Sequence, residues 1–263
     1  MRSSASALKL GTSSYGGFSN IKAKNLTIYD TYRSAIALEC VDGGVLENID
    51  ISRVRAKNTG NAIFINLGHR IKERSIGKIQ NIKIQDIEVE VPNTKPDKGY
   101  EMEGPLDTLE YNVLPSSIIG LTNNYIENIF LKKIKIIFSG GGSPEKAYIP
   151  IDSLQKVPEK AYAYPEFSMF GELPAWGFFV RHCMGMVFEN MDLRLINKDY
   201  RPAFVFDNVN KLRLVKIRVS SGGSLPAIIL KDVEKSTFKK IFTPKSSINK
   251  NLTIQKNHKK LTD

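Results

Sequence analysis

The sequence has no apolar run that approaches the roughly eighteen residues of a membrane span. Its first residues also lack the charged, apolar and small-residue order of a secretion signal. Only two cysteines are present, Cys40 and Cys183, and both stand in apolar strings far apart in the chain. Such cysteines are typical of buried free thiols rather than of a disulfide or a metal site. A hydrophobic content of 41% over 263 residues excludes general disorder and suffices for one large core or a long solenoid.

Acidic residues are fewer than basic ones, 27 against 38, which gives a formal charge of +11. From Lys231 to Asp263 nine lysines face three acidic residues, so this end carries +6 and residues 1–230 carry the remaining +5. No arginine is interleaved with that lysine run, as a nucleic-acid-binding segment would want. We therefore predict one domain over residues 1–242, followed by a solvated basic tail over 243–263, with no nucleic acid and no membrane as partner.

Long stretches of helical periodicity are also missing, and a repeated phrase stands in their place. Its clearest copies are FSNIKAKNLTI (18–28), LENIDISRVRA (46–56), IQNIKIQDIEV (79–89) and IENIFLKKIKI (126–136). Weaker copies follow at 183–195, 209–219 and 233–243. Between the copies stands a second phrase, in which a small residue precedes β-prone apolar residues, as in SAIALE and NAIFIN.

The spacing of the copies predicts the fold. Asn20 and Asn48 are 28 residues apart, and Asn48 and Asn81 are 33 apart. Each unit contains short alternating segments bounded by turn residues, which are typical of strands too short to form a sheet alone. Stacking of such units buries a continuous core, so we predict an all-β, right-handed parallel β-helix of about seven coils, with an irregular sandwich as the alternative.

Two further expectations come from the same alignment. The stacked Ile, Leu and Val positions should fill the interior of the solenoid. The repeated asparagines, with Asn128 as the fourth, should form an amide ladder at a turn in which each satisfies the backbone of the next coil. Simple turn formation is the other interpretation of these residues.

The sequence resembles glycoside hydrolase family 28 over roughly residues 3–235. The resemblance lies in the repeat sequence NIKAKNLTIYDTYRSAIALECVDGGVLENIDISRVRAKNTGNAIFI and in the later FSMFGELPAWGFFVRH and RPAFVFDNV. This family comprises the polygalacturonase-like enzymes that degrade pectin. The resemblance implies inverting hydrolysis of a galacturonic-acid-containing plant polysaccharide by a monomeric, cofactor-free right-handed β-helix. It also implies a periplasmic or secreted location for an intact member.

The family's catalytic phrases are absent. No Asn-Thr-Asp and no Asp-Asp occurs in the chain, and Ser4 to Ser6 stand where the resemblance places Gly-His-Gly. Ala37 and Glu39 replace the arginine and lysine of the family's Arg-Ile-Lys phrase, with Arg33 nearby. Because apolar alternation already runs at Ala5, we expect the chain to be truncated at its N-terminus and its catalytic aspartates to lie upstream of Met1. The chain alone should then be inactive.

The remaining prediction is a substrate-binding groove. Basic side chains suit uronate carboxylates through charge-assisted hydrogen bonds, and an aromatic ring can stack on a sugar. Residues at the same phase of consecutive coils should line up along one face, although each one alone is also an ordinary surface residue. The candidates are Lys9, Tyr15, Arg33, Glu39, Asp42, His69 and Arg70. We expect no metal ligand among them.

Two segments interrupt the repeat, at 92–115 and 139–175. Aromatic residues mark the second, which either walls a binding face or only packs onto the coils; they are Tyr148, Tyr162, Tyr164, Phe167 and Phe170, with Trp176 directly after. The first is acidic and should face away from a polyuronate or bind a cation. We interpret His182 as structural. A non-catalytic β-helix that binds acidic polysaccharide, and a calcium-dependent pectate lyase, are the functional alternatives.

Overall fold

The structure is a computed structural model that describes residues 1–94, 96, 114–143, 153–220, 226–243 and 252–255. Its regular structure is almost entirely β, apart from a 3-10 turn at Leu154–Lys156. The strands are β1 (Leu8–Leu10), β2 (Phe18–Ser19), β3 (Lys22–Cys40), β4 (Val45–Leu67), β5 (Lys78–Val91), β6 (Ser116–Ile119), β7 (Ile126–Phe138), β8 (Phe178–Leu195), β9 (Phe204–Val219), β10 (Ile228–Glu234), β11 (Thr237–Phe242) and β12 (Leu252–Gln255). Within these ranges no helix combines the length and the apolar character of a membrane span. The prediction of an all-β chain is confirmed.

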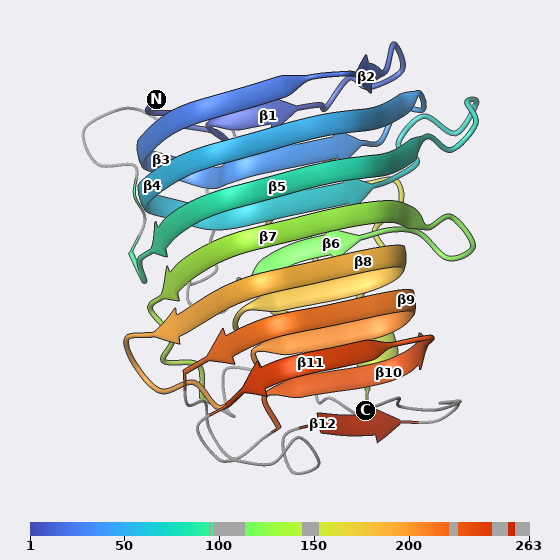
Figure 1. The fold of residues 1–263 in the computed structure, drawn as a ribbon. Coiled ribbons are helices and arrows are strands. Elements are labelled where there is room, and N and C mark those ends of the chain that lie inside the picture. Colours follow the sequence, from blue (N-terminus) through green and yellow to red (C-terminus); the bar gives the residue numbers. More distant parts are fainter. Residues whose placement is uncertain (95, 97–113, 144–152, 221–225, 244–251, 256–263) are drawn as a thin grey trace.

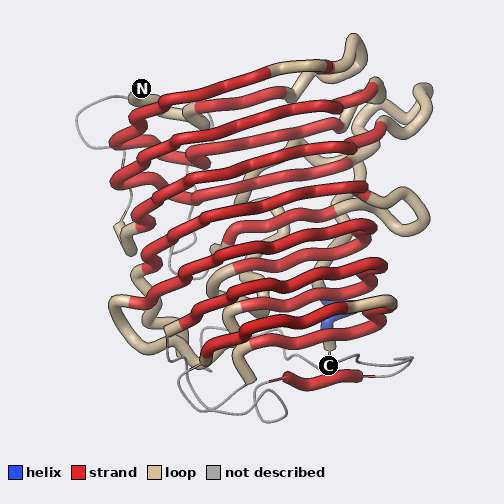
Figure 2. Tube along the Cα trace, in the orientation of Figure 1, coloured by secondary structure: helices blue, strands red, loops and turns tan. Residues whose placement is uncertain are grey.

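The named strands pair in parallel, in the order β1-β3-β4-β5-β7-β8-β9-β10-β12. Figures 1 and 2 show them as a stack that runs from the N-terminal end to the C-terminal end. Different parts of β4, β8 and β9 pair with different strands. The first half of β4 pairs with β5, and its last residues pair with β6.

The copies of the repeated phrase lie one above another in register. Lys22 pairs with Asp50, Asp50 with Lys83, and Lys83 with Phe130. The pairing continues through β8, β9 and β11. The repeat read from the sequence is therefore a stack of equivalent parallel strands.

Apolar columns run through the inside of this stack. In one column the five stacked residues Ile51, Ile84, Leu131, Phe188 and Leu214 are fully buried. Burial of each such side chain contributes roughly 1.5–3 kcal/mol. The predicted filling of the interior by stacked Ile and Leu is confirmed, with phenylalanines added in the later coils. The two cysteines are free and buried, as predicted.

The asparagine ladder is present at one bend of the stack. The Asn48 amide donates to Asn20 Oδ1 at 3.2 Å, Asn81 donates to Asn48 Oδ1 at 3.3 Å, and Asn128 donates to Asn81 Oδ1 at 3.2 Å. The four residues have φ between 55° and 58°, a left-handed conformation that asparagine tolerates better than most residues. The predicted stacking of the asparagines is thus present. Their amides bond to one another, whereas we predicted that each would bond to the backbone of the next coil.

A second cluster of buried apolar residues lies outside the stack, where residues 153–175 pack against it. We call these residues the covering segment. Phe167 and Phe170 are each 1% exposed and lie in this cluster with outward-facing Phe64, Phe179 and Val205 of the coils. These two aromatic residues thus pack the insertion onto the coils.

Other aromatic residues around the insertion have different positions. Trp176 belongs to the main core, where its ring meets Phe138 edge to face at 5.6 Å. Tyr162 and Tyr164 remain exposed. Tyr148 lies outside the described residues, as do the acidic residues predicted to matter in segment 92–115: Asp97, Glu101, Glu103, Asp107 and Glu110.

Strand β12 falls inside the stretch that the sequence predicts as a basic tail. Its residues 252–255 pair in parallel with Ile228–Lys231 of β10, so the stacking of strands continues there.

Candidate functional site

Charged side chains gather where the first strands of the stack meet the covering segment. Strand β1 and the end of β3 supply outward-facing residues, and the turns after β3 and β4 supply two more. The covering segment contributes a tyrosine and a glutamate. We call this group the charged cluster; it consists of Lys9, Thr12, Arg33, Glu39, Asp42, Arg70, Tyr164 and Glu166.

Glu39 is at the centre of the cluster, and only 2% of it is exposed. Lys9 Nζ lies 2.9 Å from Glu39 Oε2, and the Thr12 hydroxyl donates to the same oxygen at 3.3 Å. Burial raises the pKa of Glu39, and Lys9 and Thr12 partly offset that rise. A Cβ at Gly11 would lie 2.7 Å from the Glu39 Cβ, so this position needs glycine for β1 to approach β3.

Arg33 and Glu166 form a second ion pair that links the coils to the covering segment. Arg33 Nη1 lies 2.5 Å from Glu166 Oε2, with side-chain exposures of 12% and 20%. Burial raises the pKa of Glu166 to about 7, while Arg33 acts in the opposite direction; the charge of Glu39 adds to the rise. The two glutamates therefore interact, and Glu166 titrates near neutral pH.

Asp42 and Arg70 form the third pair. Arg70 donates from Nε to Asp42 Oδ1 at 2.8 Å and from Nη2 to Asp42 Oδ2 at 2.6 Å, a bidentate contact. The Asp42 side chain is almost fully buried and that of Arg70 is one-third exposed. The Ser14 hydroxyl accepts from the Asp42 backbone N–H at 3.0 Å and fixes the turn.

The Tyr164 ring lies against the cations of two of these pairs. Lys9 Nζ lies 5.3 Å and Arg70 Cζ 5.8 Å from its centroid. A hydrogen bond with Thr12 lowers the pKa of the Tyr164 hydroxyl, and the charge of Lys9 adds to this effect. Because the ring is half exposed, it gives the cluster an aromatic face toward solvent.

The structure thus brings together five of the seven residues predicted for the groove. The remaining two, Tyr15 and His69, lie beside other partners. Arg74 Cζ lies 4.4 Å from the centroid of the Tyr15 ring. His69 Nε2 is 2.7 Å from the Arg74 carbonyl oxygen, and its ring is 5.9 Å from that of Tyr162.

Sequence reasoning did not identify Glu166 as part of the site. It has no copy in the repeat, and no phase relation links it to Arg33. The only signal was the aromatic composition of the insertion, which contains Tyr164 and predicts a wall over one face. Thr12 was also missed, because it follows β1 in a turn without a distinctive motif.

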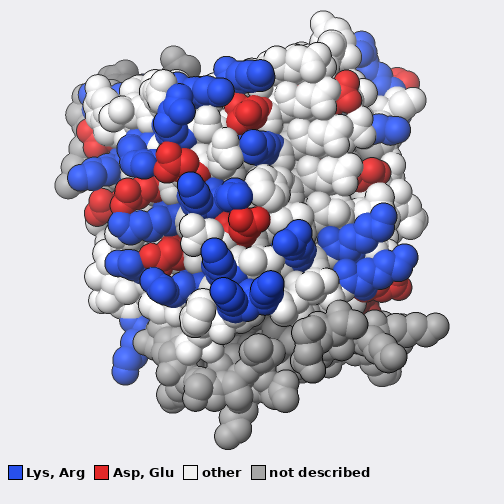
Figure 3. Space-filling view, viewed as in Figure 1, with Lys and Arg blue, Asp and Glu red and all other residues white. Residues whose placement is uncertain are grey.

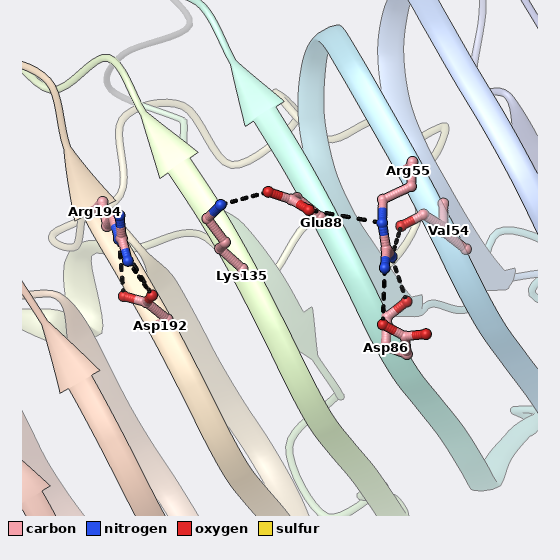
Figure 4. A network of polar contacts seen from close by, with 7 residues as sticks. All are labelled: Val54, Arg55, Asp86, Glu88, Lys135, Asp192 and Arg194. Atoms are coloured by element: carbon pink, nitrogen blue, oxygen red, sulfur yellow. Dashed lines mark hydrogen bonds and ion pairs between the residues drawn. The ribbon is translucent and has the colours of Figure 1, made fainter.

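Another outward face of the stack carries many charges, which pair with one another at the surface. Lys and Arg side chains are mixed there with Asp and Glu (Figure 3). In the network of Figure 4, Arg55 contacts Asp86 at 3.1 Å, and Lys135 contacts Glu88. These side chains are 38% to 51% exposed, so each pair contributes about 1 kcal/mol or less.

Among the described residues, no group of three or more His, Cys, Asp or Glu side chains is arranged to hold a metal ion. Comparison with known proteins found no match for this chain among family models, curated proteins or solved structures.

Proposed function

We propose that this chain is a right-handed parallel β-helix of the polygalacturonase-like type, and that its charged cluster binds galacturonic-acid-containing polysaccharide. Two features support the fold. The repeated phrases pair in parallel from coil to coil, and crossover connections between parallel strands of one sheet are right-handed in about 98% of cases.

The functional proposal rests on Lys9 and Arg70 at the exposed Tyr164 ring, with Arg33 paired to the nearby Glu166 of the same segment. Arginine and lysine bind carboxylates through charge-assisted hydrogen bonds, and a tyrosine face stacks on a sugar ring. A polyuronate offers a carboxylate on each ring, so successive sugars would meet cations from successive coils. The repeat sequence, which resembles that of pectin-degrading enzymes, supports the same substrate class.

Each cation of the cluster already has a carboxylate partner, so binding of a uronate requires exchange. The Arg33–Glu166 pair is the one suited to it, because protonation of Glu166 near neutral pH leaves Arg33 free for the ligand carboxylate. Asp42 is held by two hydrogen bonds and retains Arg70. Arg33 is therefore the principal uronate contact of the proposed site.

Titration calorimetry with trigalacturonate tests this function. Replacement of Arg33 by Met should weaken binding about tenfold or more, because a charge-assisted hydrogen bond is lost. The matched control is Arg194→Met, since Arg194 lies on the other charged face and pairs within its own strand. No binding by the unmodified chain, or equal binding by the Arg33 variant, would refute the proposal.

Hydrolysis is the second candidate function, and the proximity of Glu39 and Glu166 favours it. A carboxyl group with a pKa near 7 is suited to donate a proton, and a second carboxylate is needed for either glycosidase mechanism. Both glutamates are held in ion pairs, however, so we expect no useful rate from this chain. A reducing-sugar assay with de-esterified pectin decides the matter: turnover that Glu166→Gln abolishes would make the cluster an active site.

A further inference from the structure

A cavity of about 770 Å³ is lined by the first residues of the covering segment and by none of the residues of the charged cluster. It is bordered by β8, β9 and β10, by the turn before β7, and by residues 155–159. Its volume falls within the range of roughly 300–1,000 Å³ that small-molecule sites have. Neither the sequence analysis nor the proposed function assigns it a role.

The arginine at this cavity uses most of its N–H donors in contacts within the protein. Arg181 donates from Nε to Asp207 at 2.8 Å and from Nη1 to the Val157 carbonyl at 2.9 Å, and its Nη2 contacts Asp207 at 2.7 Å and the Leu154 carbonyl. Lys231 lies 3.8 Å from the same aspartate. Asp207 therefore neutralises the buried cation of the site.

His182 supplies a fixed neutral donor at the wall. The Asn208 amide nitrogen lies 3.0 Å from His182 Nδ1, and Tyr125 Oη lies 3.4 Å from Asn208 Oδ1. Because an amide nitrogen only donates, Nδ1 accepts and Nε2 carries the ring proton. Burial lowers the pKa of His182, and the nearby Arg181 charge adds to this effect, so the ring is neutral at pH 7.

Hydrogen-bond acceptors predominate in the remaining wall. Glu159, Asp232 and Glu234 line it, and Glu234 accepts from the Asn210 amide nitrogen at 3.2 Å. The Asn210 Oδ1 atom is buried without a hydrogen-bond partner. A buried acceptor without a donor is costly, so a donor group at this point would stabilise the site.

We propose that this cavity binds a neutral, hydroxyl-rich ligand of the size of a mono- or disaccharide. Hydroxyl groups would donate to Asn210 Oδ1 and to the carboxylates. They would also accept from His182 Nε2 in place of the Thr122 hydroxyl, which lies 3.5 Å from that atom. Tyr125 and Met184 offer apolar surface for a sugar face. The excess of carboxylates disfavours a uronate, which separates this site from the charged cluster in specificity as well as in position.

Nuclear magnetic resonance titration of the full chain with lactose, cellobiose and galacturonate tests the proposal. We expect a neutral disaccharide to bind with a Kd of about 10 mM or tighter and to shift the signals of Thr122, Tyr125 and His182. Galacturonate should not shift them. Arg33→Met, which alters the charged cluster, should leave this binding unchanged.

Two variants make the result independent of folding defects. Asn210→Leu removes the unpartnered acceptor and should weaken disaccharide binding about tenfold, and Tyr125→Phe removes the hydroxyl near Asn208 with little change in shape. A normal spectrum for the rest of the chain serves as the folding control. Stronger shifts with galacturonate, undiminished binding by both variants, or no shift with either disaccharide would overturn the proposal.

Discussion

Glu166 is the residue at which protonation and ligand binding should be coupled. Below about pH 7 its carboxyl is protonated and Arg33 is available, whereas above this pH the ionised carboxylate competes with a uronate. Affinity for trigalacturonate should therefore fall as pH rises through 7. Calorimetry between pH 5.5 and 8.5 would measure this change in affinity. These values lie about one and a half pH units on either side of the pKa of Glu166. Glu166→Gln should remove the dependence. Glu189→Gln, which removes the ion-pair partner of Lys132, is the control and should retain it.

The same residue should make the stability of the fold depend on pH. Its pKa is about 7 in the folded chain against an ordinary value of 4.5, so the folded state binds more protons between pH 4.5 and about 7. The free energy of unfolding should fall with rising pH over this window, by up to about 3 kcal/mol. Urea unfolding of the unmodified chain and of Glu166→Gln measures this. Equal slopes in both proteins would contradict the assignment.

The Asp42–Arg70 pair allows a separate test of how much a buried ion pair contributes to the stability of the fold. Arg70→Met leaves a nearly fully buried carboxylate without its two donors and should destabilise the chain by about 2 kcal/mol, since Arg70 is itself one-third exposed. The double variant Asp42→Asn/Arg70→Met removes the charge as well and should recover part of the loss. Urea midpoints measure both, and a single variant as stable as the parent would show that the pair is not structural.

At the scale of the elements, the asparagine ladder fixes one bend of every early coil. Asn81 both accepts from Asn128 and donates to Asn48, and its φ is 56°. Asn81→Gly removes the amide but keeps the conformation accessible, whereas Asn81→Ala also introduces a side chain that disfavours it.

We therefore expect Asn81→Ala to cost about 1–2 kcal/mol more than a loss of hydrogen bonds alone, and Asn81→Gly to be the milder change. Denaturant unfolding of the two variants gives the difference directly. If the alanine variant proved the more stable one, the left-handed conformation would not be the reason for asparagine at this bend.

The strands were the most predictable elements. Alternating Ile and Val between turn residues, as in residues 46–56 and 79–89, specify short strands, and their repetition specifies which strands are neighbours. The bend at Asn25, Arg53 and Asp86, which also have positive φ, was not predicted. These residue types are too varied to form a visible column in the sequence.

For the whole molecule, the covering segment determines which surfaces are sites. Its middle supplies Glu166 and Tyr164 to the charged cluster, and residues 155–159, near its start, border the cavity. Its attachment depends on Phe167 and Phe170, which pack on outward-facing apolar residues of the coils.

Replacement of both phenylalanines by alanine should release this segment, because each substitution costs about 3–5 kcal/mol of packing. We expect the coils to keep their β circular dichroism while the segment becomes sensitive to protease. Binding at the charged cluster and at the cavity should be lost together. Ile82→Val, a conservative change in the main core, is the control and should retain both. Loss of binding at only one of the two places in the double variant would show that residues 155–159 and residues 164–166 are held independently.

The sequence by itself determined the strands, their spacing, the apolar columns and the asparagine ladder, because all of these repeat from coil to coil and repetition is visible in one dimension. It also predicted one face for seven residues, since coil stacking aligns residues of equal phase. Five of them meet in the charged cluster, and Tyr15 and His69 have other partners. Only the tertiary structure decided what these residues contact. Glu166 and Tyr164 of the charged cluster, and residues 155–159 at the cavity, all belong to an insertion that has no copy in the repeat. The position of this insertion depends on the packing of its side chains against the coils. Packing between segments without a common period leaves no regular pattern in the sequence.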